Sequence, residues 1–422
     1  MADLTITMKS VIRNKKNRLD LSRDELEYAF NGYLEGTIPD YQMSALLMAI
    51  VINGMTERET IDLTDIFIKS GKTYDLSSVN GVKVDKHSTG GVGDKTTLVV
   101  GPIVAAAGGH VAKMSGRGLG VTGGTIDRLE SIPGFKTELT EEEFIEQVKT
   151  VGFAVTRQTS ELTPLDAKVY ALRDVSGTTE SIPLIASSIM SKKIACGADK
   201  ILIDIKYGTG ALLQDQSEAY KLEKIVKAIG EHYGKEVQVV ISDMNKPLGY
   251  MVGNSLEVVE AILTLQNKVH NDFSELCIEL AGYMIAMTYG LTLEEGKYRA
   301  KEVLETGRAY QKFLEFVKAQ GGDLNGLKIS PNKVELKCGV NGKLVGIDAY
   351  KFGDLARDLG AGRIKKEDKI DPTVGIEFKA SIGQMVKYGD LLAVVYYGAK
   401  GCPQININQY FKIDTLKSVT KQ

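Results

Sequence analysis

Two glycine-rich segments contain the residues of this chain best suited to chemistry. The first is VDKHSTGGVGDKTT at 84–97, and the second is KMSGRGLGVTGGTIDRLE at 113–130. Each follows a short β-like run and combines lysine, serine and threonine with many backbone N–H groups. Glycine lets the backbone approach an anion closely, and hydroxyl and ammonium groups donate hydrogen bonds to it. Two such segments close in sequence predict a phosphate-handling site rather than a protein-binding surface.

Other interpretations of these glycines are weaker. The first segment nearly matches a Walker A motif, but Asp94 precedes Lys95 where that motif needs glycine. The second contains a formal GxGxxG at 118–123, which is a weak dinucleotide signal in a chain with 44 glycines and leaves Arg117 and Thr125 unexplained. Both segments could also serve as tight turns alone.

Composition and charge exclude several classes of protein. The chain has 422 residues and a net charge of −2 with both signs interspersed, so neither a nucleic-acid patch nor a membrane-binding tail is indicated. This length allows two to three domains and a core without disulfides or metal. The four histidines lack metal-ligand spacing. The cysteines fit neither a zinc site nor a disulfide framework, which favours reduced, buried thiols at Cys196, Cys277, Cys338 and Cys402. With no apolar signal core or spanning run, we expect a cytoplasmic protein.

Helical patterns begin the chain and return later. Capping-box pairs Ser22/Glu25 and Thr56/Glu59 begin two of the helices expected within 1–71, and Asp40 is expected to cap another. Residues 163–197 again have a helical pattern, starting at Thr163-Pro164. We therefore expect a small all-helical domain at 1–71 to which 163–197 returns.

Strand patterns occupy the other segments. Strand, glycine loop and helix follow one another from about residue 80, and ILIDIK at 201–206 and VQVVISD at 237–243 are buried-strand candidates. This predicts a larger α/β domain with a mixed sheet at 72–162 and 198–330. Alternating residues around Asn341-Gly342 predict a hairpin, and the strand-rich pattern around it predicts a β-rich C-terminal module at 331–422.

At this level of detail the chain resembles a known enzyme family. KHSTGGVGD, the long second segment, YALRDV at 170–175 and ASSIMSKK at 186–193 are similar to the pyrimidine nucleoside phosphorylase and thymidine phosphorylase family, over nearly the whole chain. Anthranilate phosphoribosyltransferase is similar in architecture, but the long match separates this chain from it. The resemblance implies phosphorolysis of thymidine, deoxyuridine or uridine to free base and (deoxy)ribose 1-phosphate, with inorganic phosphate as co-substrate and no organic cofactor. It also implies domain closure and a homodimer formed through the helical domain.

The resemblance assigns roles residue by residue. It implies that phosphate is held by Lys86, Ser88, Thr97, Lys113, Ser115 and Thr125. It implies that the pyrimidine is bound by His87, Tyr170, Arg173, Ser188 and Lys192, of which His87, Arg173 and Lys192 act in catalysis. Helical spacing puts Ser188 and Lys192 on one face, and likewise Tyr170 and Arg173. His87 is expected to act as general acid towards a base carbonyl while the two cations stabilise the departing base.

Two departures from the family pattern stand out. Val121 replaces a histidine of the second segment, which puts loop ordering or rate in question. Some bacterial members hold a potassium ion, and the matching positions here are Gly93, Lys95, Leu248, Met251 and Glu260. A lysine at position 95 would compete with that cation.

Two other function classes stay open. A phosphoribosyltransferase of similar fold would need magnesium and an acidic motif; Asp243 lies in a suitable context, but no paired acidic residue follows it. A non-catalytic binding protein derived from the same fold would bind the base without turnover.

Overall fold

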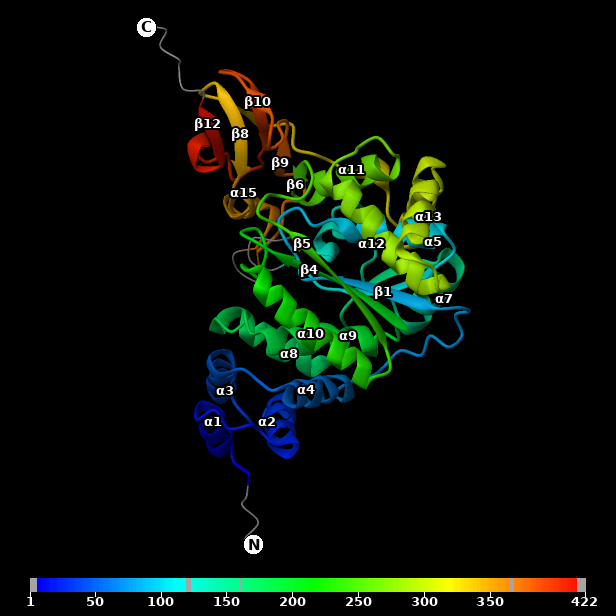
Figure 1. Cartoon of the computed structure of the whole chain (residues 1–422), viewed down its shortest axis with the longest axis vertical. Coiled ribbons are helices and arrows are strands. Elements are labelled where there is room, and N and C mark those ends of the chain that lie inside the picture. The colour runs from blue at the N-terminus through cyan, green and yellow to red at the C-terminus, as the bar shows by residue number, and fades with distance from the viewer. Residues whose placement is uncertain (1–5, 119–122, 160, 364–367, 416–422) are drawn as a thin grey trace.

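Three parts follow one another along the long axis of the molecule (Figure 1). The computed structural model describes residues 6–118, 123–159, 161–363 and 368–415. A helical bundle lies at the N-terminal end, an α/β domain in the middle and a strand-rich module at the C-terminal end. Val121 lies outside the described residues.

The N-terminal bundle is built from four helices. They are α1 (Met8–Lys16), α2 (Arg23–Glu35), α3 (Asp40–Asn53) and α4 (Glu57–Lys69). The predicted capping boxes at Ser22 and Thr56 are both formed. Asp40 does not cap α3 as predicted, because the extended Pro39 takes that position and the Asp40 carboxylate accepts a 3.0 Å hydrogen bond from the Tyr33 hydroxyl.

The helix that follows residue 163 packs against this bundle. Helix α8 (Pro164–Ser176) contributes Leu165 and Val169 to the apolar core of α1–α4, and α9 (Ile182–Ala195) contributes Leu184. The rest of α9 packs in a different core, against the sheet. Helices α8 and α9 therefore connect the bundle to the α/β domain.

A five-stranded parallel sheet forms the centre of the α/β domain. Its order is β3-β2-β1-β4-β5, and the strands are β1 (Lys83–Ser88), β2 (His110–Ser115), β3 (Phe153–Arg157), β4 (Lys200–Tyr207) and β5 (Glu236–Asp243). A mixed sheet was expected, but every strand pairing recorded in it is parallel. Each strand is joined to the next by a helix-containing crossover, which returns the chain in the same direction.

Helices cover both faces of this sheet. Alternation in β4 sends Ile201, Ile203 and Ile205 into a core with α9 and α10 (Gln216–His232), whereas Leu202 joins the core on the opposite face. The α/β helices other than α9 are α5 (Thr96–Ala106), α6 (Thr125–Glu130), α7 (Glu141–Val151), α10 (Gln216–His232), α11 (Asn254–Leu265), α12 (Asp272–Tyr289), α13 (Leu293–Glu305) and α14 (Arg308–Ala319). No single described helix has the length and apolar character to cross a membrane, although the pair α12 and α13, bent by 115°, passes that test on length and composition.

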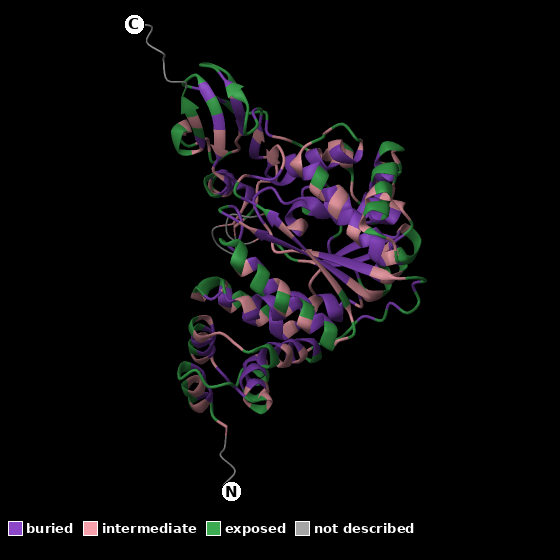
Figure 2. Ribbon diagram, viewed as in Figure 1, coloured by how far each residue is buried: buried purple, intermediate pink, exposed green. Residues whose placement is uncertain are grey.

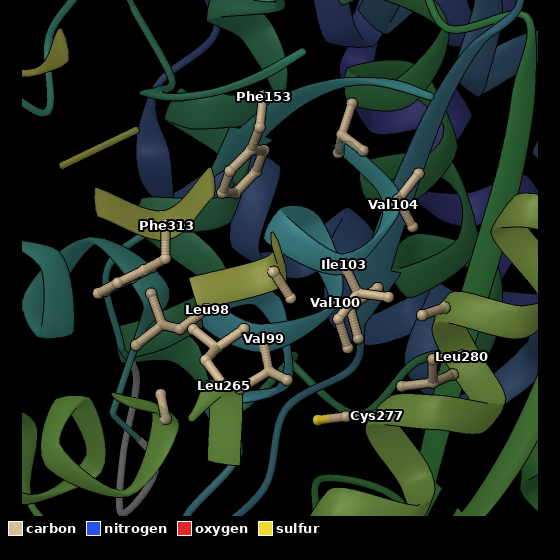
Figure 3. Close-up of a cluster of buried hydrophobic side chains, with 14 of the residues drawn as sticks. Leu98, Val99, Val100, Ile103, Val104, Phe153, Leu265, Cys277, Leu280 and Phe313 are labelled. Atoms are coloured by element: carbon tan, nitrogen blue, oxygen red, sulfur yellow. The ribbon is translucent and has the colours of Figure 1, made fainter. Parts of the chain in front are cut away.

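Helix α5 runs through the largest apolar core. Its residues from Thr96 to Ala105 are all buried, and Figure 3 shows Leu98, Val99, Val100, Ile103 and Val104 among side chains from other elements. Gly101 is needed for this packing, because a Cβ there would lie 2.4 Å from the Phe153 ring. Burial on all sides fixes α5 rigidly (Figure 2), and its first turn includes Thr96 and Thr97, the last two residues of the first glycine segment.

The C-terminal module consists of two small sheets and helix α15 (Ala349–Ala356). One sheet has the order β10-β8-β12 and the other β6-β9-β11-β7; the strands are β6 (Met251–Val252), β7 (Lys333–Lys337), β8 (Gly342–Ile347), β9 (Gly375–Phe378), β10 (Met385–Val386), β11 (Leu391–Tyr396) and β12 (Phe411–Thr415). The predicted hairpin at Asn341-Gly342 is wrong, since β7 and β8 belong to different sheets. The turn between β7 and β8 therefore connects the two sheets. The Asn341 side chain in this turn accepts a hydrogen bond from the Tyr388 N–H.

Candidate active site

Six residues predicted to bind phosphate lie on β1 and β2 and in the first turns of α5 and α6, and we call them the strand-end cluster. Ser88 ends β1 and Ser115 ends β2, while Thr97 lies in the first turn of α5 and Thr125 begins α6. Lys86 and Lys113 lie within β1 and β2. Strand order reverses between β1 and β4, and ligands of α/β sheets bind beyond the carboxyl ends of strands at such a point.

Direct contacts join part of this cluster. The Lys113 ammonium donates to the Lys86 carbonyl at 2.7 Å, and both lysines line one small internal gap together with Thr97. The Lys86 ammonium donates to the Thr96 hydroxyl. Ser115 and Thr125 flank residues 116–124, the glycine-rich part of the second segment, and 119–122 are outside the described residues.

A buried carboxylate organises the first glycine loop. Asp94 accepts hydrogen bonds from the hydroxyls of Ser88 and Thr96, the latter at 2.6 Å. Burial pushes the pKa of Asp94 upward, but the charges of Lys206 and Lys86, with these hydrogen bonds, hold it well below its usual range. Ser88 has a single hydroxyl proton, so donation to a phosphate would require the hydroxyl to turn away from Asp94.

Positive charge is concentrated around His87. Burial, followed by the charges of Lys193, Lys113, Lys192 and Lys86, holds the pKa of His87 well below its ordinary value. Burial, followed by the charge of Lys193, also lowers the pKa of Lys113 to about 7. The imidazole is therefore neutral at neutral pH, and the environment favours any group that brings negative charge.

Residues predicted to bind the pyrimidine come from α8 and α9. With Asp166 they form what we call the helix cluster: Asp166, Tyr170, Arg173, Ser188 and Lys192. The Lys192 ammonium donates to the Ser188 hydroxyl at 2.7 Å and to the Asp166 carboxylate at 2.6 Å. The Tyr170 ring lies 5.7 Å from the Arg173 guanidinium and 5.8 Å from the Lys192 ammonium. The predicted shared faces are therefore present.

Arg173 also has a structural role that its sequence context does not indicate. Its guanidinium donates to the carbonyls of Thr178 at 3.0 Å, Thr179 at 2.8 Å and Leu184 at 3.2 Å, and the side chain is buried. Three of its five N–H groups thus fasten the turn between α8 and α9. The arginine holds this turn in place and keeps two N–H groups for another acceptor.

A buried ion pair brings the two clusters together. Lys193, next to Lys192 on α9, donates to the Asp85 carboxylate of β1 at 2.6 Å and to the Met114 carbonyl of β2 at 2.9 Å. Its side chain is 1% exposed, so it is no solvated surface lysine. Helix α9 is thereby fixed to the strands that carry Lys86 and Lys113, and the Lys192 charge acts on the pKa of His87.

The five positions raised for potassium do gather in space. Lys95 donates to the Leu248 carbonyl at 2.6 Å and the Met251 carbonyl at 3.0 Å, and its ammonium lies 2.6 Å from the Glu260 carboxylate. Gly93 lies against Leu248, where an added Cβ would be 2.8 Å from its carbonyl oxygen. These residues do not fit a potassium ion, because an ammonium group already takes the oxygens that would bind it.

Sequence reasoning did not predict several charged members of this region. Asp166 was missed, although it precedes Tyr170 by four residues and so shares its helical face. Asp204 and Lys206 were interpreted only as part of a buried strand; they pair at 3.0 Å, with Lys86 3.7 Å from the same carboxylate. Charges inside an apolar strand pattern were the available signal, because buried charges require partners.

Family comparisons follow the same division of the chain. Residues 80–310 match the family described as the glycosyl transferase family α/β domain, and 9–71 match its helical bundle domain. Residues 343–412 match the pyrimidine nucleoside phosphorylase C-terminal domain. The pyrimidine-nucleoside phosphorylase of Geobacillus stearothermophilus is 49% identical over 397 residues, 92% of each chain. The chain belongs to the pyrimidine-nucleoside phosphorylase family.

A second relative agrees with this family assignment, and a solved structure shares the fold. The pyrimidine-nucleoside phosphorylase of Bacillus subtilis strain 168 is 47% identical over 414 residues, covering 96% of this chain and 95% of that protein. Among solved structures, anthranilate phosphoribosyltransferase from Thermus thermophilus is similar with a TM-score of 0.59 and 17% identity, over 74% of this chain and 99% of that one. At this identity the structural similarity shows the fold alone.

Proposed function

We propose that this chain cleaves pyrimidine nucleosides with inorganic phosphate, giving the free base and a (deoxy)ribose 1-phosphate. The observation that supports it best is the attachment of α9 to β1 and β2 through Lys193, because it sets a polar helix cluster beside a lysine-rich strand-end cluster. A phosphate dianion suits two ammonium groups and several hydroxyls at the switch point of a parallel sheet. A planar base with two carbonyl oxygens suits Arg173, Ser188 and Lys192.

The proposed reaction is a single displacement at the anomeric carbon, in which each group of the site has a role. An oxygen of the bound phosphate attacks the anomeric carbon, and the bond from that carbon to the base nitrogen breaks with its electron pair going to the base. The configuration at the anomeric carbon inverts. Negative charge that spreads to the base carbonyls is stabilised by Lys192 and the two N–H groups of Arg173 not used in the α8–α9 turn. Asp166 acts as a positioning residue, since it orients Lys192.

His87 has a different proposed role from the general acid expected at first. The low pKa of His87 leaves imidazolium scarce in the free protein, so we assign it as a neutral N–H donor to a base carbonyl. Bound phosphate would offset the charges of the surrounding lysines and raise this pKa. Phosphate binding before base departure therefore improves His87 as a donor.

A phosphoribosyltransferase of similar fold is the alternative function. Asp243 is the acidic residue considered above as a magnesium ligand of such a transferase. Its carboxylate accepts hydrogen bonds from the Asn245 backbone N–H at 2.8 Å and from the Asn245 side chain at 2.7 Å. It is engaged in its own turn, as an Asx-type residue commonly is. This favours the phosphorylase over the transferase.

A phosphorolysis assay tests the proposal directly. Purified protein is incubated with thymidine, or separately uridine, with and without inorganic phosphate and without added magnesium, and free base is followed by chromatography. We expect base release that requires phosphate, and the ratio of the two rates gives the base preference. A magnesium requirement would favour the transferase, and tight base binding without release would favour a binding protein.

We also propose that the chain forms a cytoplasmic homodimer through the helical bundle. Helix α3 supports this, because Tyr41 and Ile52 are 74% and 71% exposed and lie with Met48 along one face. Ile52→Glu should shift the protein to monomer in light scattering after gel filtration. Tyr298→Glu, on an equally exposed residue of α13, serves as the control and should leave the mass unchanged.

A further inference from the structure

Lys95 is a fully buried lysine whose ammonium is bonded only within the protein. Its ammonium donates hydrogen bonds to the Leu248 carbonyl at 2.6 Å and to the Met251 carbonyl at 3.0 Å, and it lies 2.6 Å from the Glu260 carboxylate. One carboxylate and two carbonyl oxygens therefore surround the charge of the lysine. The Phe273 ring also faces the charge at 4.7 Å.

Contacts other than those of the lysine hold this oxygen cage in shape. The Glu260 carboxylate accepts hydrogen bonds from the backbone N–H groups of Tyr250 and Met251 at 2.7 and 2.9 Å, and from the Asn271 side chain at 3.0 Å. Gly249 makes the close approach feasible, since its φ is +73° and a Cβ there would lie 2.5 Å from the carboxylate. The cage is therefore preformed by the 248–251 turn and α11. Backbone carbonyls and one carboxylate are oxygen ligands suited to a monovalent cation.

We propose that Lys95 is a built-in monovalent cation, which takes the place of a potassium ion and makes this chain independent of potassium. The ammonium has the same single charge as the ion and uses the same kind of oxygens. A potassium ion in the cage would have to displace the lysine and leave its charge buried beside another cation. The expected potassium site is thus replaced by a side chain.

Three parts of the molecule meet at this ammonium. Lys95 is the residue before α5 and follows Asp94 of the first glycine loop. The Leu248 N–H donates to the Val92 carbonyl at 3.1 Å, which joins the same turn to the same loop. Met251 begins β6, which pairs with β9 of the C-terminal module. Lys95 is therefore a positioning residue, which holds the glycine loop against the turn that leads to the module.

The unaltered protein provides the first test. Its thermal unfolding and its phosphorolysis rate are compared in potassium chloride and in tetramethylammonium chloride at equal ionic strength. We expect the same Tm and the same rate in both salts. A Tm or rate that rises specifically with potassium would overturn the proposal.

Lys95→Ser provides the second test, because it empties the cage and leaves the oxygens. In tetramethylammonium chloride this variant should unfold at a lower temperature and turn over slowly, and potassium should specifically raise both its Tm and its rate. Lys95→Met keeps the side-chain bulk without the charge, so it should lose Tm without potassium rescue. If Lys95→Ser is too unstable, it is purified in potassium chloride and exchanged before the measurement.

A matched buried pair separates this effect from general destabilisation. Lys15 of α1 is also buried against a glutamate, Glu59 at 2.8 Å, but its ammonium donates to the two oxygens of that single carboxylate instead of to a ring of carbonyls. Lys15→Ser should therefore lose stability without a potassium-specific recovery. Equal responses of Lys95→Ser and Lys15→Ser to potassium would overturn the cation cage.

Discussion

The strand-end cluster and the helix cluster stabilise their charged side chains in different ways. Around the strand ends, Asp204 lies near both Lys206 and Lys86, and the charges of the same two lysines act on Asp94, so these four groups form a network. In the helix cluster one lysine has one carboxylate, and the arginine binds backbone carbonyls. Loss of one lysine from this network leaves Asp204 with the other lysine as a partner, whereas Lys192 is the lysine recorded on Asp166. The helix cluster should therefore be the more sensitive half towards single substitutions.

The largest effect is expected at Lys192. Lys192→Ala removes the ammonium that faces the departing base, so we expect kcat to fall about 10²–10³-fold with a smaller change in the KM for phosphate. Steady-state phosphorolysis with each substrate varied in turn measures this, and circular dichroism monitors the fold. Asp166→Asn keeps the side-chain shape but loses the charge that orients Lys192, so it should give a smaller fall in kcat. Near-normal turnover of Lys192→Ala would remove this residue from the base site.

Arg173 should combine a loss of activity with a loss of stability. Arg173→Ala leaves three carbonyls of the α8–α9 turn without their donor, which should cost about 1–3 kcal/mol of unfolding free energy as well as turnover. Urea unfolding and kinetics are measured on the same preparation. Arg173→Lys restores charge with fewer donors and should recover part of the activity. An unchanged unfolding midpoint in Arg173→Ala would contradict the fastening of the turn.

Substitution of Ser115 tests whether the strand-end cluster binds phosphate. Ser115→Ala removes one hydroxyl donor to phosphate, so we expect the KM for phosphate to rise about tenfold while the KM for nucleoside stays the same. The same kinetic protocol measures both constants. A rise in the nucleoside KM alone would place Ser115 outside the phosphate site. It would also contradict the assignment of phosphate to the strand-end cluster and of the base to the helix cluster.

The two clusters also differ in how far the sequence predicts them. Glycine, lysine and hydroxyl residues contiguous in 84–97 and 113–130 indicate a phosphate site because the ligands are neighbours along the chain. Residues of the helix cluster were assigned through the family resemblance, since spacing within a helix shows only which side chains share a face. The partner of Lys193 lies 108 residues away, at Asp85, and no local pattern indicates it.

The errors in the predicted fold also come from contacts between residues that are far apart in the sequence. Capping boxes were predicted correctly because they depend on residues three apart. The hairpin at Asn341-Gly342 was wrong because strand partners are chosen by packing between distant segments, and β7 pairs with β11 instead. The direction of the central strands likewise depends on crossovers, which residue types alone do not give.

The smallest effect on the kinetics of phosphorolysis is expected from the titration of Lys113. Burial, with the charge of Lys193 next, lowers its pKa to about 7 in the folded protein, whereas an unfolded lysine titrates near 10.4. The unfolded chain thus binds more protons between these values, so stability should rise with pH from about 7 to 10 in the absence of phosphate. Loss of the same proton weakens phosphate binding, so the KM for phosphate should rise by less than about tenfold from pH 7 to pH 9.

Lys113→Met provides the control for both slopes. Without the titrating group, the contribution of Lys113 to the rise in Tm between pH 7 and pH 9 should disappear, and so should its contribution to the rise in the phosphate KM. Saturating phosphate should reduce the Tm slope of the unaltered protein, because the dianion raises the pKa of Lys113 and keeps it charged. Equal slopes in the unaltered protein and in Lys113→Met would show that the network, rather than this lysine, sets the charge of the strand-end cluster.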